Sequence, residues 1–118
     1  MTAHLIDGKR IAAEIRTHVK QKVEDRGRQG LPVPGLATVL VGEDPASQVY
    51  VRNKQKMCAE VGIRSFGHKL PASSSQEEVE ALVRELNAEP DVNGILVQLP
   101  LPAHLNEERV LSSIDLSK

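Results

Sequence analysis

The chain has 118 residues, of which 40% are apolar and 26% charged, an ordinary composition for one globular domain. Its formal net charge is −1, and Tyr50 and Phe66 are the only aromatic residues, so neither a basic stripe nor a set of stacking rings indicates a nucleic-acid partner. The single cysteine, Cys58, excludes an intrachain disulfide, and no apolar run is long enough to span a bilayer.

The N-terminal segment lacks the apolar core of a signal peptide. It runs from Met1 directly into the charged stretch Asp7-Gly8-Lys9-Arg10. Together with the lone cysteine, this predicts a protein of the reducing cytoplasm with no membrane partner.

The first predicted elements are a helix and a buried strand. A helix is expected over Lys9–Arg28, because apolar residues recur every four positions, at Ile11, Ile15, Val19 and Val23. Glycines and prolines in residues 30–35 end this pattern. The continuous apolar run Leu36–Val41 follows, which is typical of a strand buried on both faces of a parallel sheet.

A second helix is predicted from Pro45 to Val61. Asp44 can cap it, proline suits its first position, and Gly62 can end it. A weaker strand candidate, Ile63–Leu70, comes next.

The third predicted helix, Gln76–Ala88, has the clearest periodicity in the chain, with apolar residues at Val79, Leu82, Val83 and Leu86. Ser74 and Glu77 have the spacing of a capping box at its start.

The last two predicted elements are a strand, Gly94–Leu99, stopped by Pro100, and a helix over Glu107–Ile114 with Asn106 as its cap. The alternation of helices and strands predicts an α/β fold, a three-layer lobe in which helices flank a small, mostly parallel sheet. Residues 1–118 are expected to form one domain.

Ligands of open α/β sheets bind outside the carboxyl ends of the strands. Three loops are expected there: residues 42–44, 71–74 and 98–101. Tyr50 and Lys54, four positions apart on the helix that leaves the first loop, share a face, and Gln98 ends the third strand on the same sheet edge. A phenol, an amine and an amide therefore converge on one predicted cleft.

Each of these residues also has a purely structural interpretation. Lys54 can be a solvated charge, Tyr50 a core aromatic with a wet hydroxyl, and Gln98 an amide that caps a strand end. The Tyr50-x-x-x-Lys54 pattern also occurs in short-chain dehydrogenases, but no G-x-G-x-x-G loop precedes it.

Two other classes of protein remain as alternatives. One is a non-catalytic binding or regulatory module such as a receiver-like domain, for which Glu43 and Asp44 offer the acidic pair. The other is an enzyme that forms a Schiff base through a lysine. No metal site is expected, because the histidines are scattered without ligand spacing, at His4, His18, His68 and His104.

Two long motifs carry a specific family resemblance. The segments Ala46–Ile63 (ASQVYVRNKQKMCAEVGI) and Gly94–Pro102 (GILVQLPLP) resemble the bifunctional methylenetetrahydrofolate dehydrogenase/cyclohydrolase family. Ile6–Lys9 and Leu36–Pro45 fit the same pattern, so the resemblance covers essentially the whole chain.

The resemblance implies a folate-binding catalytic lobe, with a Rossmann lobe for NADP and a returning terminal helix beyond Lys118. It implies oxidation of 5,10-methylenetetrahydrofolate to the methenyl cation and hydrolysis to 10-formyltetrahydrofolate. It also implies a homodimeric parent. Since the family's Asp-Val-Asp-Gly stretch is expected after Lys118, this chain by itself is not expected to act as a dehydrogenase.

By position, the resemblance makes Lys54 the catalytic lysine, Tyr50 the residue that orients the folate rings, and Gln98 the hydrogen-bond partner of Lys54. The remaining substrate-binding residues that it implies are Ser47, Val51, Val97 and Leu99. We expect Lys54 to act largely neutral, as general base for a water that attacks the methenyl cation, with a hydrogen bond from the Tyr50 hydroxyl helping to hold the amine.

Overall fold

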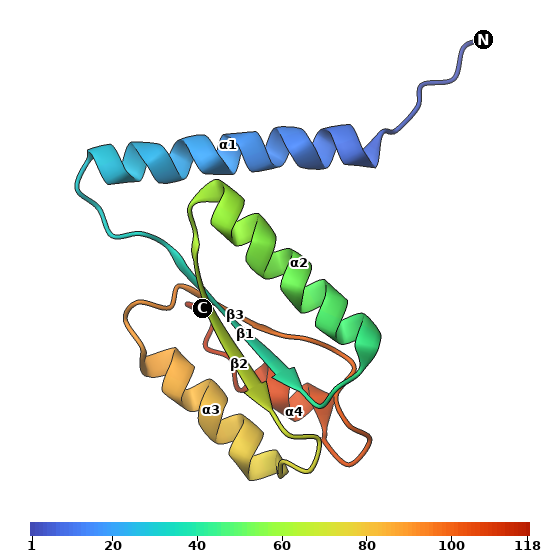
Figure 1. Cartoon of the computed structure of the whole chain (residues 1–118), viewed down its shortest axis with the longest axis vertical. Coiled ribbons are helices and arrows are strands. Elements are labelled where there is room, and N and C mark those ends of the chain that lie inside the picture. The colour runs from blue at the N-terminus through green and yellow to red at the C-terminus, as the bar shows by residue number, and fades with distance from the viewer.

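The computed structural model describes residues 1–118, and its elements follow one another in the predicted order (Figure 1). The helices are α1 (Gly8–Arg28), α2 (Pro45–Val61), α3 (Gln76–Ala88) and α4 (Glu107–Ser112). The strands are β1 (Gly35–Val41), β2 (Arg64–Leu70) and β3 (Gly94–Val97).

The three strands form one parallel sheet in the order β2-β1-β3. The chain enters at the central strand, β1, continues to β2 at one edge and then crosses to β3 at the other edge. The direction of winding therefore reverses between β1 and β3, and in α/β folds such a switch point opens a crevice at the carboxyl ends of the two strands. The predicted small parallel sheet flanked by helices is confirmed.

Alternation along β1 separates the two faces of the sheet. Ala37, Val39 and Val41 belong to the main apolar core, which they share with side chains of α3, β3 and α4. Thr38 and Leu40 face the other way, toward α2. Figure 1 shows α2 on one side of the sheet, with α3 and α4 on the other.

Helix α1 stands apart from the sheet and lies across the C-terminal end of α2 (Figure 1). None of its residues is buried, so the apolar stripe predicted on this helix remains partly exposed at Ile11 and Ile15. None of the helices combines the length and the apolar character that are needed to cross a membrane.

Several element ends differ from the predicted ones. Helix α1 starts one residue earlier, because Asp7 caps it by accepting a hydrogen bond from the Arg10 amide. Strand β2 starts at Arg64 rather than at residue 63, and β3 ends at Val97 rather than at residue 99. Helix α4 ends at Ser112, before the predicted residue 114, because the chain tightens into a turn in which the Ile114 amide donates to the Leu111 carbonyl.

The predicted capping box was wrong by one residue. The Ser75 hydroxyl accepts from the Glu78 amide, and the Glu78 carboxylate accepts from the Ser75 amide. Ser74 is instead buried, with its carbonyl accepting from the His104 ring. Sequence spacing allows either Ser74 with Glu77 or Ser75 with Glu78 to form the capping box. Because Ser74 is buried, Ser75 and Glu78 form it.

Replacing Ser75 with alanine is expected to lower the free energy of unfolding by about 1 kcal/mol, because the first turn of α3 loses its cap. The Ser74→Ala variant is the matched control, since the Ser74 side chain takes no part in the cap of α3, which Ser75 and Glu78 form. Urea denaturation of both variants measures the difference. A larger loss in Ser74→Ala than in Ser75→Ala would contradict the assigned register.

Candidate active site

The candidate site lies between α2 and the end of β3, at the switch point of the sheet. Helix α2 begins where the sequence predicts, because the Asp44 carboxylate accepts from the Ser47 amide at 2.8 Å and Pro45 occupies the first turn. It ends at Gly62, whose φ of 87° is in the left-handed region that favours glycine. These two signals place Lys54 in the middle of the helix.

Lys54 and Gln98 meet across the gap between α2 and β3. The Lys54 Nζ atom donates a hydrogen bond to Gln98 Oε1 at 2.7 Å. Gln98 Nε2 donates to the Leu99 carbonyl at 3.0 Å. Since the amide nitrogen is held there, the amide oxygen faces Lys54.

The main chain of Gln98 is anchored as well. Its amide donates to the Val39 carbonyl at 2.9 Å, so hydrogen bonding with β1 continues one residue beyond the end of β3. The side chain of Gln98 is therefore presented from the rigid end of the sheet rather than from a free loop. A site built on such an element holds its geometry more closely than one built on loops.

Ser47 joins the first turn of α2 to the segment after β3. Its side chain is 1% exposed, and its hydroxyl donates to the Leu99 carbonyl at 3.4 Å. The same carbonyl accepts from Gln98, so one acceptor fixes both side chains. The Leu99–Pro100 peptide bond that follows is cis.

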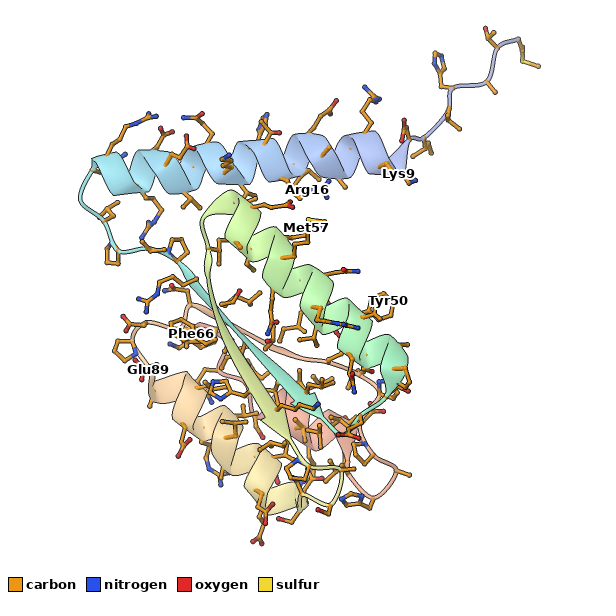
Figure 2. The ribbon with its side chains drawn as sticks, viewed as in Figure 1. Lys9, Arg16, Tyr50, Met57, Phe66 and Glu89 are labelled. Atoms are coloured by element: carbon orange, nitrogen blue, oxygen red, sulfur yellow. The ribbon has the colours of Figure 1, made fainter.

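Tyr50 lies one helical turn before Lys54 and is 58% exposed. Figure 2 shows its ring on α2 pointing away from the body of the protein. The Lys54 Nζ atom lies 5.9 Å from the ring centroid, within the range of a cation–π contact. The structure has no hydrogen bond between the Tyr50 hydroxyl and Lys54, so the ring rather than the hydroxyl contacts the amine.

The structure brings together five of the seven residues that the resemblance implies: Ser47, Tyr50, Lys54, Gln98 and Leu99. Val97 is buried in the core on the α3 side of the sheet, so its side chain points away from Lys54. Val51 is buried between α2 and the sheet and lines a cavity on the other flank of the helix. Val51 and Val97 therefore pack in the interior, next to the elements that carry the site, and their side chains do not lie beside Lys54.

The arrangement presents an amine beside an open aromatic face, with no carboxylate in an ion pair with the amine. A neutral amine can donate one N–H to Gln98 and still offer its lone pair to a proton. The receiver-like alternative is not favoured, because the Asp44 carboxylate is engaged in capping α2. No cluster of three or more histidine, cysteine or acidic side chains is placed to hold a metal ion.

Residues 6–118 match the sequence model of a protein family, the catalytic domain of tetrahydrofolate dehydrogenase/cyclohydrolase. The bifunctional protein FolD of Moorella thermoacetica is 56% identical over 118 residues, which are 100% of this chain and 42% of that protein. The chain therefore spans less than half the length of this relative.

Two solved structures share the fold over nearly the whole chain. The bifunctional FolD enzyme, a methylenetetrahydrofolate dehydrogenase/cyclohydrolase from Campylobacter jejuni, has a TM-score of 0.94 at 43% identity, covering 98% of this chain and 40% of its own. The Trypanosoma brucei FolD enzyme, complexed with NADP cofactor and inhibitor, has a TM-score of 0.89 at 39% identity, covering 98% and 40%.

Proposed function

The chain belongs to the tetrahydrofolate dehydrogenase/cyclohydrolase family, and we propose that residues 1–118 form the folate-binding catalytic domain of a bifunctional enzyme of one-carbon metabolism. Its substrate is 5,10-methylenetetrahydrofolate, which is oxidised to the 5,10-methenyl cation and then hydrolysed to 10-formyltetrahydrofolate. The observation that carries the proposal is the 2.7 Å hydrogen bond between Lys54 and Gln98 beside the exposed ring of Tyr50.

Hydrolysis is the step to which this chain's residues contribute directly. Water adds its oxygen to the one-carbon bridge of the cation, and the neutral Lys54 amine accepts the proton that the water loses. The same proton is then available to the ring nitrogen that leaves the bridge as the formyl group forms. The cationic substrate disfavours a second positive charge on Nζ. The hydrogen bond to Gln98 Oε1 uses one N–H of the amine and leaves the lone pair of the neutral amine available to a water.

NADP is the proposed hydride acceptor for the oxidation step, as the nicotinamide supplies the redox chemistry. Residues 1–118 contain no G-x-G-x-x-G loop, so they do not fit a dinucleotide. The match covers 40% of the Campylobacter jejuni chain, which leaves about 60% of that chain unmatched. We propose that NADP binds to the part of a longer protein that corresponds to this unmatched portion. The homodimeric assembly that the resemblance implies and the cytoplasmic location that the N-terminal segment and the lone cysteine predict belong to the same proposal.

Replacing Tyr50 with alanine is expected to weaken tetrahydrofolate binding about tenfold, because a ring stacked on an aromatic side chain gains on the order of 1–3 kcal/mol. The test uses a chimera in which this chain replaces the matching 40% of the Campylobacter jejuni enzyme. Isothermal titration calorimetry with tetrahydrofolate gives Kd.

The Tyr50→Phe variant is the matched control, since it keeps the ring and removes only the hydroxyl, which has no hydrogen bond in the structure. Its Kd is expected to stay within about twofold of the parent chimera. Equal affinity in Tyr50→Ala and the parent would exclude the stacking role. An unsubstituted chimera that folds but does not bind tetrahydrofolate would count against the proposed function itself.

A further inference from the structure

We propose that a second cavity, on the flank of α2 opposite Lys54, binds a small organic anion that carries a phosphate group. The cavity lies between α2 and strands β1 and β2 and has a volume of about 330 Å³, within the range of small-ligand sites. Its walls include Thr38, Leu40, Val51, Arg52, Gln55 and Lys69. The proposed folate site does not use it.

The geometry of α2 and the sheet separates the two sites. Arg52 is two residues from Lys54, so the two side chains leave the helix about 200° apart. In the parallel register Thr38 pairs with Gly67, and Leu40 pairs with Lys69. Paired residues of neighbouring strands point to the same face, so Lys69 lies on the α2 side together with Arg52.

The floor of the cavity is shaped by Gly67 and lined by hydrogen-bond donors. A Cβ atom at Gly67 would lie 2.6 Å from Gln55 Nε2, so any other residue here would move this amide from its present position. Gln55 Nε2 donates to the Thr38 hydroxyl at 3.4 Å. Thr38 is 1% exposed, and its hydroxyl, which accepts this hydrogen bond, also carries one proton that it can donate.

The rim carries positive charge that no carboxylate neutralises. Neither Arg52 nor Lys69 forms an ion pair or a side-chain hydrogen bond, and no acidic residue lines the cavity. Glu43 borders an adjoining depression next to Lys69 but does not approach it within ion-pair distance. In a chain of net charge −1, two unpaired cations above a floor of donors form a local site for an anion.

The chemistry of these groups selects the class of ligand. The Arg52 guanidinium can bind two phosphate oxygens at once, and the Lys69 ammonium can bind a third as a point charge. The amide of Gln55 and the hydroxyl of Thr38 can donate hydrogen bonds to further oxygen atoms of the ligand. Leu40 and Val51 provide apolar contact for the carbon part of the molecule. A phosphate monoester with a small apolar group matches both the charged and polar groups and the apolar groups that line the cavity.

Phenyl phosphate is the probe, and binding is measured on the 118-residue chain by 15N–1H NMR titration. Saturable shifts are expected for the amides of Thr38 and Gly67 and for the side-chain amide of Gln55. The double variant Arg52→Gln/Lys69→Gln is expected to weaken binding at least about tenfold, because it removes two charge-assisted contacts. The matched control Lys56→Gln removes a positive charge from the same helix outside the cavity and is expected to change Kd less than twofold.

Three results would overturn the proposal: no saturable shift with phenyl phosphate, unchanged binding in the double variant, or an equal loss in Lys56→Gln. Benzoate distinguishes a phosphate from a carboxylate ligand, and equal binding of benzoate would overturn the phosphate assignment. A Gly67→Ala variant, checked for folding by circular dichroism, is expected to lose binding because its Cβ displaces Gln55. Tetrahydrofolate binding by the chimera is independent of these outcomes.

Discussion

Replacing Lys54 with methionine is expected to lower the rate of methenyl-cation hydrolysis in the chimera by about 10²–10⁴-fold, the usual contribution of a general base. Methionine has a similar length and no amine, so it leaves the space occupied while it removes the base. Loss of the donor also leaves Gln98 Oε1 without its 2.7 Å partner. The decay of the methenyl chromophore, corrected for the uncatalysed reaction, measures the rate.

The matched control is Lys56→Met, on the same helix and about 200° around it from Lys54. Lys56 is exposed and makes no ion pair, so the rate of its variant is expected to stay within about twofold of the parent. Tetrahydrofolate affinity is measured in both variants to separate binding from chemistry. Near-parent hydrolysis in Lys54→Met would remove Lys54 from the role of base, whatever its affinity for folate.

The element order could be predicted from the sequence because its local signals are strong and agree with one another. Asp44, Pro45 and Gly62 bound α2, and the apolar run of residues 36–41 identifies the central strand. The sheet order, with β1 in the middle, depends on long-range packing and had to come from the structure. Only that order shows that the end of β3 adjoins α2.

The meeting of Lys54 with Gln98 could be anticipated in part. Both residues lie at the carboxyl edge of a parallel sheet, and a glutamine within an apolar strand requires a partner. The anchor on the Leu99 carbonyl could not be anticipated, since it depends on the path of the chain after β3. The same limit explains Val97, because the face toward which a strand residue points follows from the register of the whole strand.

One residue in the sequence, Gly67, could have indicated the second cavity. Gly67 interrupts a strand, which often marks a close approach of another group. The approaching group, Gln55, lies on a helix twelve positions earlier, and nothing in the spacing connects the two. The same kind of close approach occurs at Gly35, where its consequence for stability can be measured.

Replacing Gly35 with alanine is expected to lower the free energy of unfolding by about 3 kcal/mol, which corresponds to a fall in Tm of roughly 10 °C. The new Cβ would lie 2.1 Å from the Asp91 carbonyl oxygen and 2.7 Å from a ring carbon of Phe66, so the backbone must move. That movement also strains two hydrogen bonds, from the Gly35 amide to Asn93 Oδ1 and from the Asn93 amide to the Gly35 carbonyl.

The matched control is Gly27→Ala in α1, where nothing lies within 4 Å of the new Cβ. In a helix this change is expected to leave stability unchanged or to raise it by up to about 1 kcal/mol, because alanine loses less conformational freedom on folding. The opposite signs of the two glycine substitutions separate steric contact from backbone entropy. Unfolding of Gly35→Ala at the same urea concentration as Gly27→Ala would show that Asp91 does not approach Gly35 closely in solution. The placement of β3 beside β1 would then lose its support. The position of Gln98 depends on that placement.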